Sequence, residues 1–212
     1  TIYTGANVGD KGSIFFADAT TGSNAEKKGQ ISYEQNNEIM TFFTNHTLAM
    51  SIDAAGQITK PLQPMVEVRA NTTQTIATSG NTKVTIWGTE TTDQNGDFAS
   101  NTFTAPVTGH YLSTGMLTFS TMGAGSGLGI SYFHTPSGSN SDSLLKHAYG
   151  QSTEINITHG LTWTNIISLN AGDKLNIAVN QGSGGNEDIG TASNFGSGST
   201  ANSNYWTIFL LG

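Results

Sequence analysis

The sequence of 212 residues contains no cysteine, so disulfides cannot stabilise it, and a small disulfide-stapled secreted scaffold is excluded. Charge is scarce: 11% of the residues are charged, and eight Lys and Arg stand against fifteen Asp and Glu. Because nucleic-acid affinity depends on clustered Lys and Arg, the net charge of −7 excludes DNA and RNA as partners. The sequence also lacks the ~18 consecutive apolar residues of a membrane-spanning helix, so we expect no membrane insertion.

Small and polar residues dominate the chain instead. There are 26 glycines and only four prolines, and serine, threonine and asparagine are frequent throughout. Threonine tolerates the extended conformation of a strand, and glycine and asparagine supply the positive φ angles of tight turns. The composition therefore predicts an all-β protein of short strands joined by turns, without long helices.

Residues 1–60 form the first predicted part of the chain, a β-hairpin stalk or docking segment. Short apolar runs alternate there with polar or glycine-containing turns, as in GSIFFAD, GQISYEQ, EIMTFFTN, LAMSID and GQIT. Isolated hairpins of this length are marginal in water because they cannot bury their apolar sides. We therefore expect this segment to be covered, either by other copies of the chain or by the domain that follows.

Two prolines, Pro61 and Pro64, predict a stiff hinge at residues 61–64, because proline disfavours both a helix and a central strand. Beyond it, residues 65–212 contain ten strand-like segments at regular spacing, which predicts a sandwich or jelly roll of two five-stranded sheets. The segments are MVEVRA, TQTIAT, KVTIWG, DFASNTFTA, HYLSTGMLTFS, GLGISYFHT, SLLKHAY, TEINITHGLTWTNIISL, DKLNIAVNQ and NYWTIFLLG.

The stretch FTAPVTGHYLSTGMLTFS, residues 103–120, carries apolar residues on both faces of one predicted strand. A first strand ends at Pro106, PVTG has turn chemistry, and alternation then begins. In a simple sandwich the outer face is polar, so Leu112 and Met116 need a cover, for which another subunit is the simplest candidate. One face receives Tyr111, Ser113, Gly115, Leu117 and Phe119, and the other His110, Leu112, Thr114, Met116 and Thr118.

Three motifs of residues 65–212 resemble those of the C1q and tumour-necrosis-factor-like jelly-roll superfamily. They are FTAPVTGHYLSTG, ISLNAGDKLNIAV and the closing NYWTIFLLG, in that order. The resemblance implies a ten-stranded jelly roll that assembles as a homotrimer, with Tyr111, Phe209 and Leu211 near the threefold axis and Gly109 and Gly172 in turns. The loops at 123–129 and 182–204 are longer and richer in glycine than is usual in the family, so ligand contacts of the family are not transferred.

The segment GQISYEQNNEIMTFFTNHTLAMSIDAAGQI resembles repeats that precede the distal ends of phage tail fibres and bacterial surface fibres. The shared features are G-x-I-x-Y, F-x-T-N and M-x-I-D-x-x-G. Such segments are β-structured, intertwined stalks. A stalk followed by a trimeric head implies a fibre, spike or decoration protein of a bacterial virus.

Metal binding is not predicted. The five histidines, none in a zinc-binding spacing, are His46, His110, His134, His147 and His159. A threefold axis could still gather three copies of one His or Asp. Asp93 and Asp97 loosely resemble a calcium loop, but a type I′ hairpin turn at Asn95-Gly96 explains this run better. Glu187 and Asp188 form a second acidic pair.

Catalytic chemistry is not predicted either. The glycines at 123–129 fit neither a nucleophile elbow nor a phosphate-binding loop, and no pair of carboxylates is suited to glycan cleavage. Three tryptophans offer a sugar-binding platform, although their positions within strands favour core or interface packing. They are Trp87, Trp163 and Trp206, and the Asn-x-Thr triplets, which chance explains, begin at Asn45, Asn71 and Asn156.

The sequence thus predicts a non-enzymatic structural protein of a bacteriophage virion, without a cofactor, exposed on the particle surface. It is expected to be a homotrimeric fibre or spike that joins other virion proteins through its N-terminal segment. The loop at 182–204 is the predicted contact with the host surface, and its low charge favours glycan hydroxyls over an ionic partner. A capsid decoration protein or head fibre without a receptor role, and a secreted C1q-like lectin, are the alternatives.

Overall fold

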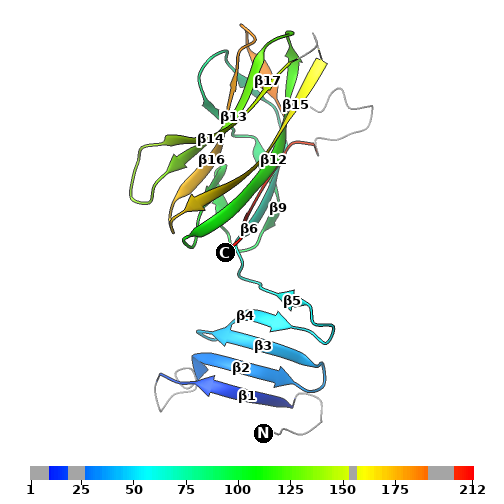
Figure 1. Ribbon diagram of the computed structural model, residues 1–212, viewed down its shortest axis with the longest axis vertical. Helices are drawn as coiled ribbons and strands as arrows, with labels where there is room; N and C mark the ends of the chain where they lie inside the picture. The colour runs from blue at the N-terminus through cyan, green and yellow to red at the C-terminus, as the bar shows by residue number, and fades with distance from the viewer. Residues whose placement is uncertain (1–9, 19–26, 153–156, 191–202) are drawn as a thin grey trace. The chain divides into compact units, whose positions relative to one another are not determined.

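The computed structural model describes residues 10–18, 27–152, 157–190 and 203–212, and in these every regular element longer than one residue is a β-strand. The chain divides into two compact units, Thr1–Gln63 and Pro64–Gly212 (Figure 1), which we call the N-terminal unit and the head. A membrane-spanning helix is not found among the described residues.

The N-terminal unit is a single antiparallel sheet in which neighbouring strands follow one another in sequence. All five strands coincide with the apolar runs that predicted them, and consecutive hairpins share strands to make one layer (Figure 1). Asn45 and His46, with φ angles of 47° and 63°, form the tight turn between the third and fourth strands. The strands are β1 (Lys11–Phe16), β2 (Gly29–Glu34), β3 (Ile39–Thr44), β4 (Thr47–Ile52) and β5 (Ile58–Thr59).

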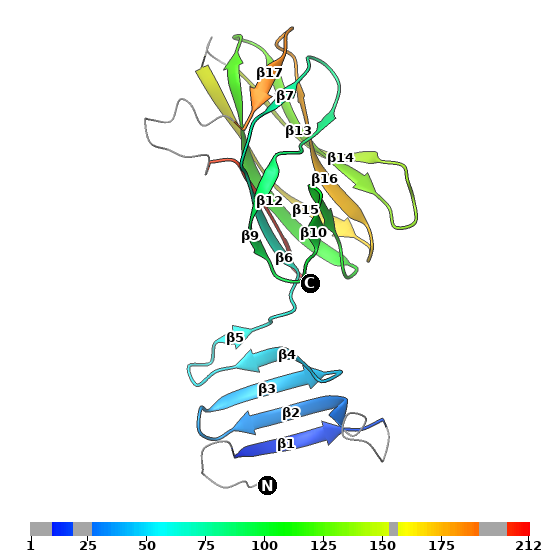
Figure 2. The same cartoon turned by 180° about the vertical axis from the view of Figure 1, so that it is seen from behind.

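The head is a sandwich of two antiparallel sheets (Figures 1 and 2). The six-stranded sheet has the order β10-β11-β16-β13-β14, with β8 against β16; the seven-stranded sheet has the order β7-β17-β12-β18-β6-β9, with β15 against β12. The strands are β6 (Met65–Ala70), β7 (Gln74–Ile76), β8 (Thr82–Lys83), β9 (Trp87–Asp93), β10 (Phe98–Ala99), β11 (Thr102–Thr104), β12 (Gly109–Met122), β13 (Gly127–Thr135), β14 (Ser143–Gln151), β15 (Ile157–Leu169), β16 (Lys174–Gln181), β17 (Glu187–Ile189) and β18 (Tyr205–Leu210).

The sandwich was predicted with ten strands, and the additional strands come from three places. DFASNTFTA folds into β10 and β11 because Ser100 and Asn101 both have positive φ angles, 50° and 61°, and form a two-residue turn. KVTIWG contains the end of β8 and the start of β9. Strand β17 lies within the predicted loop 182–204 and pairs with β7 and β12.

The predicted hairpin at Asn95-Gly96 is wrong. Strands β9 and β10 belong to different sheets, so the segment between them crosses the sandwich, and only Gly96 of the two turn residues has a positive φ. The Asp93 carboxylate accepts hydrogen bonds from the backbone N–H groups of Asp97 and Phe98, at 2.8 and 3.1 Å. The acidic run therefore shapes a crossover loop.

The alternation predicted for residues 110–119 is confirmed, because Tyr111, Leu117 and Phe119 are fully buried between the sheets. Gly115 lies on the same inner face, opposite Trp163 on β15 and Trp206 on β18. A Cβ at Gly115 would lie 2.3 Å from Cζ2 of Trp163 and 2.4 Å from the backbone oxygen of Tyr205. Glycine is therefore required here, so that an indole ring can lie against the β12 backbone.

The Ser113 hydroxyl is the polar centre of the head core. Its Oγ accepts hydrogen bonds from the Tyr132 hydroxyl at 3.0 Å and from Trp206 Nε1 at 2.8 Å, and all three residues are buried. Burial raises the pKa of Tyr132 to about 12, outweighing the hydrogen bonds with Ser113 and Asn165 that lower it. The Tyr132 phenol therefore remains a hydrogen-bond donor at neutral pH.

Replacing Ser113 with alanine should destabilise the head, because two buried donors lose their acceptor at once. An unsatisfied buried group costs about 1–3 kcal/mol, so we expect a loss of about 2–4 kcal/mol in the free energy of unfolding. Differential scanning calorimetry should show Tm lowered by roughly 5–15 °C. Ser168→Ala is the matched control, because Ser168 is exposed and its hydroxyl bonds the exposed His110. Equal Tm values for the two variants would contradict this role of Ser113.

The buried carboxylate of Asp173 joins two loops at one end of the sandwich. It accepts the backbone N–H groups of Asn170 and Ser137, at 2.9 and 2.8 Å, and contacts His134 Nε2 at 3.0 Å. Burial acts to raise the pKa of Asp173, but the hydrogen bonds from Asn170, His134 and Ser137 outweigh it and leave the pKa below its ordinary 3.8. Gly172 forms the turn as predicted, with a φ of 85°.

Acid should weaken the head through Asp173. A carboxylate whose pKa is lower in the folded state stabilises the fold above the unfolded pKa of about 3.9, and this stabilisation is lost as pH falls through the folded value. We expect Asp173→Asn to cost about 1–3 kcal/mol at pH 7 and to flatten the fall of Tm between pH 5 and pH 3. The exposed Asp142, paired with Lys83 at 2.9 Å, is the control, and Asp142→Asn should cost less than about 1 kcal/mol. An unchanged pH profile of Asp173→Asn would refute the assignment.

Candidate functional site

The outer face of the seven-stranded sheet carries a row of apolar side chains. In the register of the sheet, Leu112 on β12 lies opposite Ile166 on β15 and Phe209 on β18, and Phe209 lies opposite Met65 on β6. Ile166 is 55% exposed and Met65 is also exposed, while Leu112 and Phe209 are half-buried. These four residues, which we call the head row, form an apolar band across four strands that the described residues of the head do not cover.

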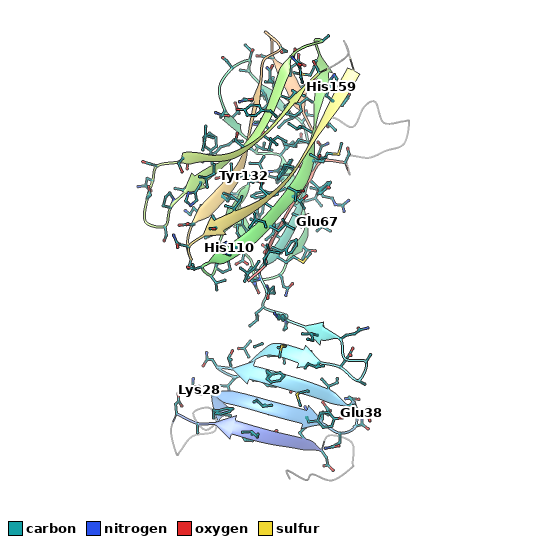
Figure 3. All side chains as sticks on the ribbon, viewed as in Figure 1. Lys28, Glu38, Glu67, His110, Tyr132 and His159 are labelled. Carbon is teal, nitrogen blue, oxygen red and sulfur yellow. The ribbon has the colours of Figure 1, made fainter. Side chains whose placement is uncertain are left out.

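The apolar surface continues beside the head row, where the first and last residues of the head lie. Leu211 is 48% exposed, and with His110, Ile166 and Gly212 it lines a shallow hollow of about 440 Å³. Figure 3 labels His110 at this end of the head.

The neighbouring part of the same outer face is polar. Thr114 hydrogen-bonds Thr164 at 3.0 Å, and Arg69 pairs with Glu67 at 2.8 Å (Figure 3 labels Glu67). The half-buried Met116 lies farther along β12. The outer face is therefore apolar at one end and hydrophilic next to it, as in an interface with a rim.

The three predicted interface residues differ in their positions. Phe209 belongs to the head row, and Leu211 lies next to it. Tyr111 is fully buried on the inner face, where its hydroxyl donates to the Val107 carbonyl at 2.7 Å, and in a single chain it has no surface for a partner. Leu112, the next residue, provides the exposed apolar surface of this strand.

Met65 and Ile166 were not predicted for this surface. The sequence signal for Ile166 was its position directly before Ile167, because two successive isoleucines in a strand place one side chain on each face. Met65 gave no comparable signal, because its place beside Phe209 depends on the pairing of β6 with β18, which the sequence does not specify.

The sheet of the N-terminal unit also has one apolar face. The register places nine apolar side chains on that face and no charged side chain from any of its five strands. The opposite face is mostly polar; for example, Ser13 bonds Ser32 at 2.9 Å and Lys11 pairs with Glu34 at 3.3 Å. The nine residues, which we call the N-terminal apolar face, are Ile14, Phe16, Ile31, Tyr33, Met40, Phe42, Met50, Ile52 and Ile58.

The N-terminal apolar face is not covered by any described residue of the N-terminal unit itself. No apolar side chain within residues 10–18 and 27–63 is buried. Ile14, Ile31 and Met40 line a shallow hollow of about 200 Å³ on it. A sheet one layer thick has no second layer to bury this face, so its stability requires a partner surface.

The described residues contain no group of three or more His, Asp or Glu that could hold a metal ion. His134 contacts Asp173 and His110 contacts Ser168, while His46 and His159 lie on other elements (Figure 3 labels His159). The side chain of His147 lies outside the described residues.

The acidic pair Glu187 and Asp188 holds the short strand β17 in place. The Asp188 carboxylate accepts a hydrogen bond from the Thr75 hydroxyl at 2.6 Å, and the Asp188 backbone N–H donates to Ser120 Oγ at 2.9 Å. Of the predicted host-contact loop 182–204, residues 191–202 lie outside the described part of the chain.

The tryptophans do not form an exposed platform. Trp87, Trp163 and Trp206 are buried, and Trp206 lies 6.3 Å from Trp87 and 5.9 Å from Phe98 between ring centroids, so core packing is confirmed and the sugar platform is wrong. Among the Asn-x-Thr positions, Asn45 lies in a turn, where its side-chain oxygen accepts a hydrogen bond from Lys28 Nζ at 2.8 Å. The backbone N–H of Asn71 donates to the Ile86 carbonyl. Asn156 lies outside the described residues.

Comparison with known proteins identifies the architecture of the head. No protein-family model matches the sequence, and a search of curated proteins finds no match. Among solved structures, Eiger TNF from S. frugiperda superposes with a TM-score of 0.52 at 12% identity, covering 71% of this chain and 93% of that one.

Two further structures match less closely. The globular domain of zebrafish complement 1qA protein is 19% identical with a TM-score of 0.44, covering 71% of this chain and 98% of that one. Murine APRIL is 10% identical with a TM-score of 0.49, covering 70% and 99%. The likeness to Eiger TNF, together with the two-sheet topology, confirms the predicted fold class: the head is an all-β sandwich of the C1q/TNF-like jelly-roll type.

Proposed function

We propose that the chain is a structural virion protein of a bacteriophage, a non-enzymatic homotrimer exposed on the particle, whose C1q/TNF-like head contacts the host surface. The observation that supports this proposal is that each unit carries an apolar face that its own described residues do not cover, namely the head row and the N-terminal apolar face.

Other copies of the same chain are the partner that these faces fit best. The strands of the N-terminal apolar face carry no charge on that side, so no complementary charge is required of a partner. Every copy presents the same apolar face at the same concentration, and closed symmetric assemblies of identical chains are the usual form of soluble oligomers. The same reasoning applies to the head row.

The size of the N-terminal apolar face indicates that both units contribute. Five strands at ~4.8 Å spacing, up to six residues long at ~3.3 Å per residue, make a face of about 24 by 20 Å, or about 480 Å². A stable interface buries about 800 Å² on each partner. This flat footprint is smaller than the accessible area of such an interface, so we expect contacts of the head row to contribute as well.

The trimeric state and the virion role are supported by the resemblance of the two units to known families. C1q and TNF domains commonly form homotrimers, and the GQISYEQ to DAAGQI segment resembles the repeats of phage fibres. In such a particle, the N-terminal unit joins other virion proteins, and the head is presented to the bacterial envelope. Host-surface glycan is the proposed target, because the chain has little charge with which to bind an ionic receptor.

The full chain should have three times the mass of one 22.2 kDa chain in light scattering. Ile166→Glu should weaken or abolish the trimer, because it places a charge in the head row at a side chain that is more than half exposed in the single chain. Leu144→Glu is the control: Leu144 is another exposed apolar residue, on β14 of the opposite sheet, and its variant should remain trimeric. A wild-type monomer that melts cooperatively would contradict the proposal.

The N-terminal unit offers a more closely matched pair of variants, which amide hydrogen exchange can compare. Ile14 and Phe15 are adjacent and both 45% exposed, but only Ile14 lies on the N-terminal apolar face. Ile14→Glu should speed amide hydrogen exchange in β2 to β4, and Phe15→Glu should not. Equal exchange in the two variants would exclude this face as an interface.

The location of the chain in the virion can be tested with antibodies against the head. Immunogold electron microscopy of the phage that encodes the chain should place the label on tail fibres or spikes. Label on the capsid instead would indicate a decoration protein or head fibre. If purified virions carried no label while the chain was secreted by its organism, the lectin alternative would replace the virion role.

A further inference from the structure

A second surface of the head, on the outer face of the six-stranded sheet, has a chemistry unlike that of the head row. It is a hollow of about 250 Å³ with Tyr149 on one side, Asn180 on the other, and Ser79, Gly80 and Gly127 at its margin. We call it the glycine hollow. No charged residue lines it, and Gln181 and Gly182 complete the lining.

The strand register brings an aromatic ring and an amide together over a glycine. Tyr149 on β14 lies opposite Gly129 on β13, and Gly129 lies opposite Asn180 on β16. A Cβ at Gly129 would lie 2.3 Å from Asn180 Oδ1 and 3.1 Å from Tyr149 Cε1. Any other residue at 129 would therefore force the Asn180 side chain to move from its present position beside Tyr149.

Both functional side chains of the glycine hollow have access to solvent. Tyr149 is 68% exposed, the largest fraction among the exposed large apolar side chains of the described chain. Asn180 is half-buried, and its Nδ2 donates to Asn81 Oδ1 at 3.3 Å, so the amide is held with its oxygen toward Gly129. The hollow thus presents a ring and a hydrogen-bond acceptor.

Buried hydrogen bonds fix the margin of the hollow. Gln181 is buried, and its Nε2 donates to the carbonyls of Ile76 and Gly185, at 3.1 and 2.7 Å. The backbone N–H of Ser79 donates to the Gln181 carbonyl at 3.0 Å, and Gly182 donates to Gly127 at 3.0 Å. A margin held in this way is formed before any ligand arrives, which lowers the cost of binding.

We propose that the glycine hollow binds one unit of a neutral saccharide. The Tyr149 ring would stack on the C–H face of the sugar, while the Asn180 amide and nearby backbone groups bond its hydroxyls. An anionic ligand would need Lys or Arg in the lining, and an apolar peptide would need more than one apolar side chain there. This inference rests on the proposed function, because it assigns the proposed contact with host glycan to a specific site on the head.

Saturation-transfer difference NMR of the full chain tests the site. The probes are D-glucose, D-galactose, D-mannose and N-acetyl-D-glucosamine, with N-acetylneuraminic acid as the charged comparison. At least one neutral sugar should receive saturation at its ring protons, and Tyr149→Ala should reduce that signal about fivefold or more through the lost aromatic contact. Tyr149→Phe, which keeps the ring, should retain most of it. Because Tyr149 is 68% exposed, both variants should remain folded, with Tm changed by no more than a few degrees.

The inference is overturned if none of the four neutral sugars gives a signal, if N-acetylneuraminic acid alone does, or if Tyr149→Ala binds like the wild type. Adsorption of the labelled chain to host cells separates this result from the proposed function. If the chain adsorbs to host cells without binding sugar, the virion role is supported and the glycine hollow is excluded as a saccharide site. If sugar binding depends on Tyr149 but the chain neither adsorbs to host cells nor is labelled on virions, the glycine hollow is supported as a saccharide site and the proposed function is excluded.

Discussion

A β-strand has two faces, and strand β12 carries apolar side chains on both. The inner face is buried in the sandwich, where Gly115 allows Trp163 to lie against the backbone and Ser113 accepts two buried donors. The outer face presents Leu112 within the head row, and the described residues of the head form no third layer over it. The same imbalance recurs in the N-terminal unit, where one side of the sheet is apolar and the other mostly polar. Each unit thus has an apolar face that its own described residues leave uncovered.

The two surfaces of the head for which we propose functions lie on opposite sheets. The head row belongs to the seven-stranded sheet, and the glycine hollow belongs to the six-stranded sheet. They also differ in chemistry, because the first is aliphatic and aromatic, whereas the second combines one ring with an amide and bare backbone. Opposite faces of this kind allow one sheet to be occupied by other copies while the other remains available to a ligand.

Short-range patterns predicted much of this architecture. Alternation placed Leu112 outward and Tyr111, Leu117 and Phe119 inward, and the five apolar runs of the N-terminal unit all became strands. Turn chemistry was less informative. Asn95-Gly96 is the strongest hairpin signal in the sequence and yet lies in a crossover, whereas the hairpin turn is at Ser100-Asn101, within what looked like one continuous strand. Which of the two turns forms a hairpin depends on how distant strands pair, and this pairing cannot be predicted from a single sequence. The head row and the glycine hollow depend on the same information, because Met65 meets Phe209, and Tyr149 meets Asn180 across Gly129, only through register.

The single layer of the N-terminal unit has a thermodynamic consequence. The head has its own interior, a cluster of buried residues from Val66 to Ile208. The N-terminal sheet has no interior among its described residues, so whatever covers its apolar face supplies its stability. By mass action, the order of such a sheet depends on the concentration of the covering partner. One polypeptide therefore joins a unit with a buried interior to a unit without one, and in the proposed assembly the N-terminal sheet would become stably ordered only once its partner is bound.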